Sequence, residues 1–264
     1  MEQLEIIFYA LIQGTTEFLP ISSSAHLLIL EELFKWEKLG ITYAISAHIG
    51  TLIAVCLHQK KEIKMFFKSL KNLNRLTLYS SKNNLAINLI ICTTPIIIIG
   101  GFFMLFLHNF YLGIFVLAWA SIVGGVFLEL ADRFSKNEEN KIITKRVALL
   151  AGFFQCLSII PGMSRSGSVI TSLRLMGIGR VSSAKFSLLA SIPVIISAGI
   201  VEFFSIMLIN KSFEVFINFF LIASLSSITS FFTIKLLINW LKKRSFTPFV
   251  IYRIILGMVI LSLF

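Results

Sequence analysis

A single arginine stands in an otherwise apolar part of the sequence, and its neighbours suit the binding of an anion. Arg165 lies in the stretch PGMSRSGS, residues 161–168, between the apolar runs 147–160 and 169–176. An arginine near the middle of a bilayer costs at least ~2.5–3.5 kcal/mol, so it normally faces a polar cavity. Hydroxyls, backbone amides at a helix start and a guanidinium together favour phosphate. We predict that this loop binds phosphate through Gly162, Ser164, Arg165, Ser166, Gly167 and Ser168.

A second polar stretch, with the sequence QGTTEFLPISSSAH, carries residue types that suit hydrolysis of a phosphoric anhydride. Glu17 can bind a divalent cation (Mg²⁺ or Ca²⁺) that bridges phosphates, or act as a general base. Gln13 lies one helical turn earlier on the same face and can add a neutral oxygen ligand. His26 can attack phosphorus or activate the nucleophile, and Ser23 is a second candidate for the nucleophile.

Each of these residues also has a structural interpretation. Glu17 could be a structural carboxylate that pairs with Arg165, and Arg165 could extend from a kinked helix to the membrane surface. Serines in membrane helices often bond to a carbonyl one turn earlier, so a single serine does not define a site. His48 is interpreted as a residue that lines a cavity or packs between helices.

The composition is that of a membrane protein with several spans. Of 264 residues, 56% are hydrophobic and only 14% are charged. A soluble domain does not need so large a share of apolar residues. The net charge of +11 resides in the connections between apolar runs, a pattern that orients membrane proteins, so we expect no nucleic-acid partner. Three cysteines lie in apolar segments without metal-ligand spacing and are expected to be small buried residues.

The order of apolar runs predicts an all-α protein with an internal repeat. Short apolar pieces flank each polar loop and predict two re-entrant helical hairpins, which enter and leave the membrane on the same side. Three spans are expected after each hairpin, at residues 41–58, 85–107, 111–131, 186–209, 213–241 and 247–264. We therefore predict one membrane domain over residues 1–264, with repeats at 1–131 and 147–264 joined by a cytoplasmic linker at 132–146.

Counting the crossings predicts that the two repeats have opposite topology. A hairpin crosses the membrane zero times and three spans cross it an odd number of times, so the second repeat must begin on the other side. With the N-terminus outside, the segments 59–84, 132–146, 174–185 and 235–253 are cytoplasmic and hold 20 of the 24 lysines and arginines. The hairpin loops then meet near the midplane, and the two polar stretches, Ser22 included, form one site.

The two motifs together resemble those of the undecaprenyl-diphosphate phosphatase family of bacterial inner membranes, over the full length of the chain. The resemblance implies an integral membrane hydrolase that removes one phosphate from the polyprenyl diphosphate and so recycles the lipid carrier of peptidoglycan synthesis. It also implies a pocket open to the periplasmic side and bacitracin resistance. By position, Gln13 and Glu17 would hold the cation, His26 and Ser23 would serve catalysis, and Arg165 would bind phosphate.

The resemblance has one departure and one competing function. The second motif usually ends in a threonine where this chain has Val169, and Ser168 or Thr171 is a candidate for the missing hydroxyl. Inverted repeats with broken helices are also typical of secondary transporters, so a polyprenyl-phosphate flippase is the alternative. The sequence leaves open whether His26 or Ser23 is the nucleophile, which divalent ion is used, and whether the chain forms a homodimer.

Overall fold

The computed structural model describes residues 3–36, 41–71, 84–106, 113–206 and 213–264. Within them the chain is helical, and its only β-type pairing is an isolated bridge between Glu138 and Ile178. The described elements are α1 Gln3–Thr16, α2 Ser23–Phe34, α3 Ile41–His58, α4 Lys60–Lys71, α5 Leu85–Phe106, α6 Ile114–Phe134, α7 Lys145–Cys156, a 3-10 turn Leu157–Ile159, α8 Arg165–Leu175, α9 Arg180–Ile206, α10 Phe213–Leu241 and α11 Thr247–Leu263.

The predicted hairpins are present as two pairs of short helices. The helices α1 and α2 flank the first polar loop, and α7 and α8 flank the second. The incoming helix α7 ends at Cys156, and a 3-10 turn at Leu157–Ile159 follows it before the second loop. In both hairpins a serine precedes the outgoing helix with a positive φ, 70° at Ser22 and 65° at Ser164. This conformation is uncommon for a residue other than glycine.

Six further apolar helices correspond to the six predicted spans. Four of them, α5, α6, α9 and α10, are long and apolar enough to cross a membrane, while α3 and α11 are shorter apolar helices. Large apolar side chains on these helices are exposed, among them Ile98, Phe127 and Leu236. Apolar side chains on the outside of a helical bundle fit a lipid environment, and the protein is a multi-pass membrane protein.

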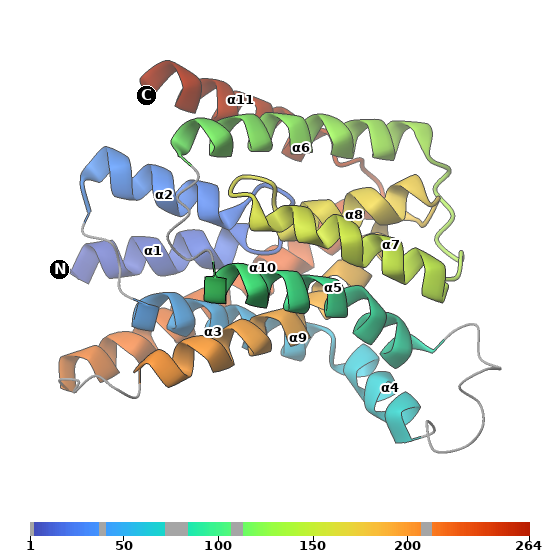
Figure 1. Ribbon diagram of the computed structural model, residues 1–264, viewed down its shortest axis with the longest axis horizontal. Helices are drawn as coiled ribbons and strands as arrows, with labels where there is room; N and C mark the ends of the chain where they lie inside the picture. Colours follow the sequence, from blue (N-terminus) through green and yellow to red (C-terminus); the bar gives the residue numbers. More distant parts are fainter. Residues whose placement is uncertain (1–2, 37–40, 72–83, 107–112, 207–212) are drawn as a thin grey trace.

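The two hairpins enter the molecule from opposite ends and their loops meet in its middle (Figure 1). The Oγ of Ser166, in the second hairpin, donates to the carbonyl of Leu19, in the first, over 2.9 Å. The long helices surround this junction: α10 packs against both α1 and α3, α11 against α6, and α5 against α7. The arrangement brings together two loops that lie far apart in the sequence.

Close packing against α10 fixes the end of α1 that leads to the first loop. A Cβ on Gly14 would lie 2.7 Å from the carbonyl oxygen of Ser226, so only glycine permits this approach. Two serines of α10 bind the backbone of α1: Ser226 Oγ donates to the carbonyl of Ala10 over 3.0 Å and Ser230 Oγ to that of Gly14 over 2.7 Å. Glu17 follows directly on this fixed segment.

The charged connection 59–84 contains the helix α4, and its residues 72–83 lie outside the described part of the chain. One expectation about the charged segments needs correction. Arg253, counted among the cytoplasmic loop charges, is instead inside α11 and fully buried. Its position near the start of an apolar run resembles that of a loop charge, and the sequence does not reveal its buried polar partners.

Candidate active site

The Glu17 carboxylate is the centre of the junction between the hairpins, and both its oxygens are bound. Its Oε1 accepts from Nη2 of Arg165 over 2.9 Å, across 148 positions of sequence. Its Oε2 accepts from Ser23 Oγ over 2.8 Å and from Gln13 Nε2 over 2.8 Å. The structure therefore brings together four residues that the sequence predicted to share a site: Gln13, Glu17, Ser23 and Arg165.

His48 of α3 is a further residue of this junction. Its Nδ1 lies 3.3 Å from Gln13 Nε2 and 4.0 Å from Glu17 Oε1. The interpretation of His48 as a residue that lines a cavity is confirmed, but its contact with Glu17 was not predicted. The signal available in the sequence was an imidazole inside an apolar span, which by itself does not identify the partner.

His26 does not join this cluster. Its Nδ1 lies 2.7 Å from the carbonyl oxygen of Ser22, and its Nε2 lies 2.6 Å from the hydroxyl of Tyr252 in α11. The two rings are stacked, with centroids 5.5 Å apart and planes 1° from parallel. Both ring nitrogens are therefore engaged away from Glu17, and His26 orients the first loop against α11.

The second loop uses most of its hydroxyls to hold its own shape. Ser164 caps α8 by accepting from the backbone N–H of Gly167 over 3.2 Å. Ser168 donates to the Ser164 carbonyl over 2.9 Å, and Ser166 is bound to the first hairpin as described above. Gly162 has a φ of 94°, which favours glycine. Among the residues predicted to bind the substrate, Arg165 and Ser164 of this loop and Ser22 of the first loop line the polar cavity at the junction.

The position where a threonine was expected faces the core. Val169 is fully buried in an apolar cluster formed by α5, α7, α8 and α9. The two candidates for a replacement hydroxyl, Ser168 and Thr171, line a separate cavity of about 310 Å³ next to Gly124 and Met163. In this arrangement neither hydroxyl lines the cavity that holds Glu17 and Arg165.

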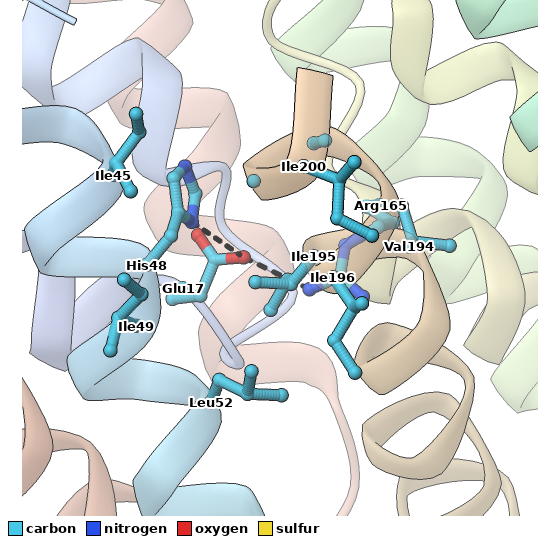
Figure 2. Close-up of a pocket in the computed structure, with 12 residues that line it drawn as sticks. Glu17, Ile45, His48, Ile49, Leu52, Arg165, Val194, Ile195, Ile196 and Ile200 are labelled. Carbon is cyan, nitrogen blue, oxygen red and sulfur yellow. Dashed lines mark hydrogen bonds and ion pairs between the residues drawn. The ribbon is translucent and has the colours of Figure 1, made fainter. Parts of the chain in front are cut away.

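Two cavities of different character meet at the junction. The polar cavity has a volume of about 270 Å³ and is lined by Gln13, Glu17, Ser22, Ser23, Ser24, Leu27, His48, Ser158, Ser164 and Arg165. The apolar groove, of about 480 Å³, runs between α3 and α9. Figure 2 shows Glu17, His48 and Arg165 at this groove, with isoleucines of both helices around them. These three residues line both cavities.

The two residues that were predicted to hold a divalent cation, Gln13 and Glu17, are in contact, with Gln13 Nε2 2.8 Å from Glu17 Oε2. In the described part of the chain no three His, Cys, Asp or Glu side chains gather into a metal cluster, so the protein itself offers few ligands. The side-chain amide of Gln13 donates through Nε2 to Glu17 Oε2. A 180° flip of this amide, which exchanges its oxygen and nitrogen, would place Gln13 Oε1 next to Glu17 Oε2. Mg²⁺ is typically bound by one or two carboxylates together with substrate phosphates.

Comparison with known proteins identifies the family. Residues 6–259 match the family described as Bacitracin resistance protein BacA. The chain is similar to an undecaprenyl-diphosphatase of Campylobacter curvus, with 36% identity over 100% of both chains. It is also similar to those of Saccharophagus degradans (38% identity; 97% of this chain, 96% of the relative) and Alteromonas mediterranea (35%; 99% and 98%). Because the match covers residues 6–259, the chain belongs to the BacA family, and its two hairpins meet at Glu17 and Arg165.

Proposed function

We propose that the protein hydrolyses undecaprenyl diphosphate to undecaprenyl phosphate and inorganic phosphate. This activity would return the lipid carrier of peptidoglycan synthesis to use and contribute to bacitracin resistance. The names of three relatives that match almost the whole chain support the proposal. The residues at the junction of the hairpins support it independently, because they combine features for a phosphate and for a lipid.

The observation that carries the proposal is the sharing of Glu17, His48 and Arg165 between a polar cavity and an apolar groove. A polyprenyl diphosphate has a charged head and a long apolar tail. The head fits the cavity that contains Arg165 and the serines, and the tail fits the groove between α3 and α9. A water-soluble diphosphate would leave the groove unused.

Arg165 is the residue that we assign to the phosphate. Its Nη2 donates to Glu17 Oε1, and an arriving phosphate would accept hydrogen bonds from the other N–H groups of the guanidinium. A guanidinium presents a fork of donors that matches two phosphate oxygens. Negative charge that develops in the transition state would be stabilised by Arg165, whose side chain is only 14% exposed.

Ser23 is the residue that we assign as nucleophile. Its hydroxyl already donates to Glu17, so the carboxylate can take the proton as Ser23 Oγ forms a bond to the terminal phosphorus. The bond between this phosphorus and the bridging oxygen breaks, and undecaprenyl phosphate leaves. Water then attacks the phosphorus of the phosphoserine, and the bond from phosphorus to Ser23 Oγ breaks. Glu17 returns its proton to Ser23 Oγ, and the two protons of the water leave on inorganic phosphate, released as H₂PO₄⁻. His26, bound to Tyr252, would keep the loop in place.

Glu17 and Gln13 are the residues that would hold a divalent cation. Such an ion supplies positive charge that neutralises the diphosphate oxygens. Glu17 faces the cavity with a carboxylate, and Gln13 and Ser23 add oxygen atoms next to it. The open volume around them leaves room for water molecules.

The protein would lie in the bacterial inner membrane as an inverted repeat with its site open to the periplasmic side. The opposite entry of the two hairpins supports this topology (Figure 1). The matching serines with positive φ, Ser22 and Ser164, support a common origin of the hairpins. The concentration of basic residues in the segments assigned to the cytoplasm supports the orientation.

Purified protein in detergent with undecaprenyl diphosphate and Mg²⁺ tests the function. The proposal predicts equal amounts of inorganic phosphate and undecaprenyl phosphate as products. A flippase would move the lipid between leaflets of a vesicle without releasing phosphate. If no inorganic phosphate is released but the lipid still moves between the leaflets of vesicles, the protein is a transporter and the proposed phosphatase function is wrong.

A further inference from the structure

Arg253 of α11 is a fully buried arginine without a carboxylate partner among the described residues. Its exposed fraction is 0%, and none of the ion pairs in the described part of the chain includes it. Arg174, which is equally buried, shows the usual solution, because it pairs with Asp132 over 2.8 Å. A buried charge is costly, and the bonds that Arg253 makes therefore call for an explanation.

The Arg253 guanidinium binds backbone carbonyls of both hairpins. Its Nη2 donates to Gly162 over 3.0 Å and to Met163 over 3.1 Å, both in the second loop. Its Nη1 reaches the carbonyl of Pro20, in the first loop, at 3.5 Å. A further bond of 3.3 Å to Ala120 ties the same group to α6. One side chain thus contacts both loops that form the junction.

Glycines in the surrounding helices leave the space that this guanidinium occupies. A Cβ on Gly124 of α6 would lie 2.3 Å from Nη2 of Arg253. A Cβ on Gly167 of α8 would lie 3.1 Å from Nη1. Since any larger residue at position 124 would displace the guanidinium, the helices are shaped around it.

The hydrogen bonds from Arg253 to the second loop hold the backbone immediately before Arg165 in the sequence. The carbonyl of Met163 points at Arg253, and because a trans peptide is planar, the N–H of Ser164 points the opposite way. Ser164 then takes its φ of 65° and caps α8. An uncommon backbone conformation persists only where the surrounding structure stabilises it, and the hydrogen bonds from Arg253 contribute to that stabilisation.

We propose that Arg253 is a positioning residue for the phosphatase reaction. It fixes the loops of both hairpins in the register at which Glu17 meets Ser23 and Arg165. The inference rests on the proposed function, since the register matters for phosphate transfer. Arg253 lines neither the polar cavity nor the apolar groove, so it acts on the reaction through the loops.

This role predicts a particular pattern in the kinetics. Binding of the substrate depends largely on the tail in the groove, which Arg253 does not touch. Alignment of Ser23 and Arg165 with phosphorus depends on the loops. Loss of Arg253 should therefore lower kcat by at least ~10-fold while KM stays within about threefold, because small misplacements weaken transition-state contacts more than ground-state binding.

Two substitutions test the role from different sides. Arg253→Gln removes the charge and most of the donors. Gly124→Ala keeps Arg253 but pushes the end of its side chain away from the carbonyls. The matched control is Gly125→Ala in the same helix, where the new Cβ would lie 3.3 Å from the Cβ of Arg253 and requires only a small adjustment. A second control, Arg174→Gln, alters the other buried arginine.

Phosphate release is measured per molecule of folded, monodisperse protein, together with hydrogen exchange of the loop peptides. We expect Arg253→Gln and Gly124→Ala to lose kcat, and both loops to exchange faster, with or without substrate. Gly125→Ala and Arg174→Gln should keep kcat within about threefold and leave exchange in the loops unchanged.

Two results would overturn the role of Arg253 while leaving the phosphatase intact. One is a parent-like kcat in Arg253→Gln. The other is a loss of kcat in Arg174→Gln as large as that in Arg253→Gln, which would reduce both residues to general supports of the fold. Failure of the parent protein to release phosphate would instead refute the proposed function, and the exchange of the loops would still report whether Arg253 holds them.

Discussion

Ser23 and Arg165 bind opposite oxygens of the Glu17 carboxylate from two different hairpins. They occupy equivalent places, each directly after a serine with positive φ and at the first residue of the outgoing helix. One hairpin thus supplies a hydroxyl and the other a guanidinium to a single carboxylate. In the function proposed above, the nucleophile and the anion-binding group therefore lie on two sides of the proposed base.

The assignment of the nucleophile predicts different outcomes for Ser23→Ala and His26→Gln. Without the hydroxyl the covalent route is lost, so Ser23→Ala should reduce phosphate release by ~10³-fold or more. His26→Gln keeps a donor near Tyr252 and should retain activity within ~10–30-fold of the parent. Rates measured in detergent test this order. The reverse order, with His26→Gln the more damaged, would move the nucleophile to His26.

Arg165→Lys separates phosphate binding from charge balance. Lysine keeps the positive charge next to Glu17 but lacks the planar fork of donors. If Arg165 holds two phosphate oxygens, the variant should insert into the membrane and yet lose ~10²–10³ in rate. Expression, membrane fraction and phosphate release are measured together. A rate within about threefold of the parent would make Arg165 a counter-ion of Glu17.

The groove between α3 and α9 can be narrowed without touching the polar cavity. Gly199 lines the groove and a Cβ there meets no atom within 4 Å, so Gly199→Leu would fill space that we assign to the tail. We expect KM for undecaprenyl diphosphate to rise ~10-fold, because each buried CH₂ contributes about 0.8 kcal/mol. A short-chain diphosphate such as farnesyl diphosphate should be less affected.

Gly101→Leu is the matched control for the groove. Its Cβ likewise meets no atom within 4 Å, but it lies on α5 and outside the groove. Its KM should equal that of the parent. Equal effects of the two substitutions, or no effect of Gly199→Leu on the long substrate, would place the tail elsewhere.

The proposed topology predicts which single cysteines react with a membrane-impermeant thiol reagent in intact cells. In a background without native cysteines, Asn137→Cys and Lys243→Cys should be shielded, since the inverted repeat assigns both to the cytoplasm. Glu214→Cys, at the start of α10, should be labelled from outside. Labelling of Asn137→Cys together with shielding of Glu214→Cys would reverse the orientation.

Much of the fold was predictable because hydropathy and proline- and serine-rich loops are local signals. The two short-helix hairpins follow from polar stretches inside apolar runs, and counting the crossings predicts that Glu17 and Arg165 meet. The direction of His26 was not predictable, since it depends on a hydroxyl 226 positions away, that of Tyr252. Arg253 was misassigned for a similar reason: its partners are backbone carbonyls of distant loops, which no side-chain pattern reveals.

The most direct measurement is phosphate release from undecaprenyl diphosphate by the parent protein and by Glu17→Gln, each with Mg²⁺ and with excess chelator. Glutamine keeps the size of the side chain but removes the base and the charged ligand, so the rate should fall by ~10²-fold or more. Chelator should abolish the activity of the parent, and Mg²⁺ should restore it. Full activity of Glu17→Gln, or an active parent in excess chelator, would contradict a site centred on Glu17 and a divalent cation.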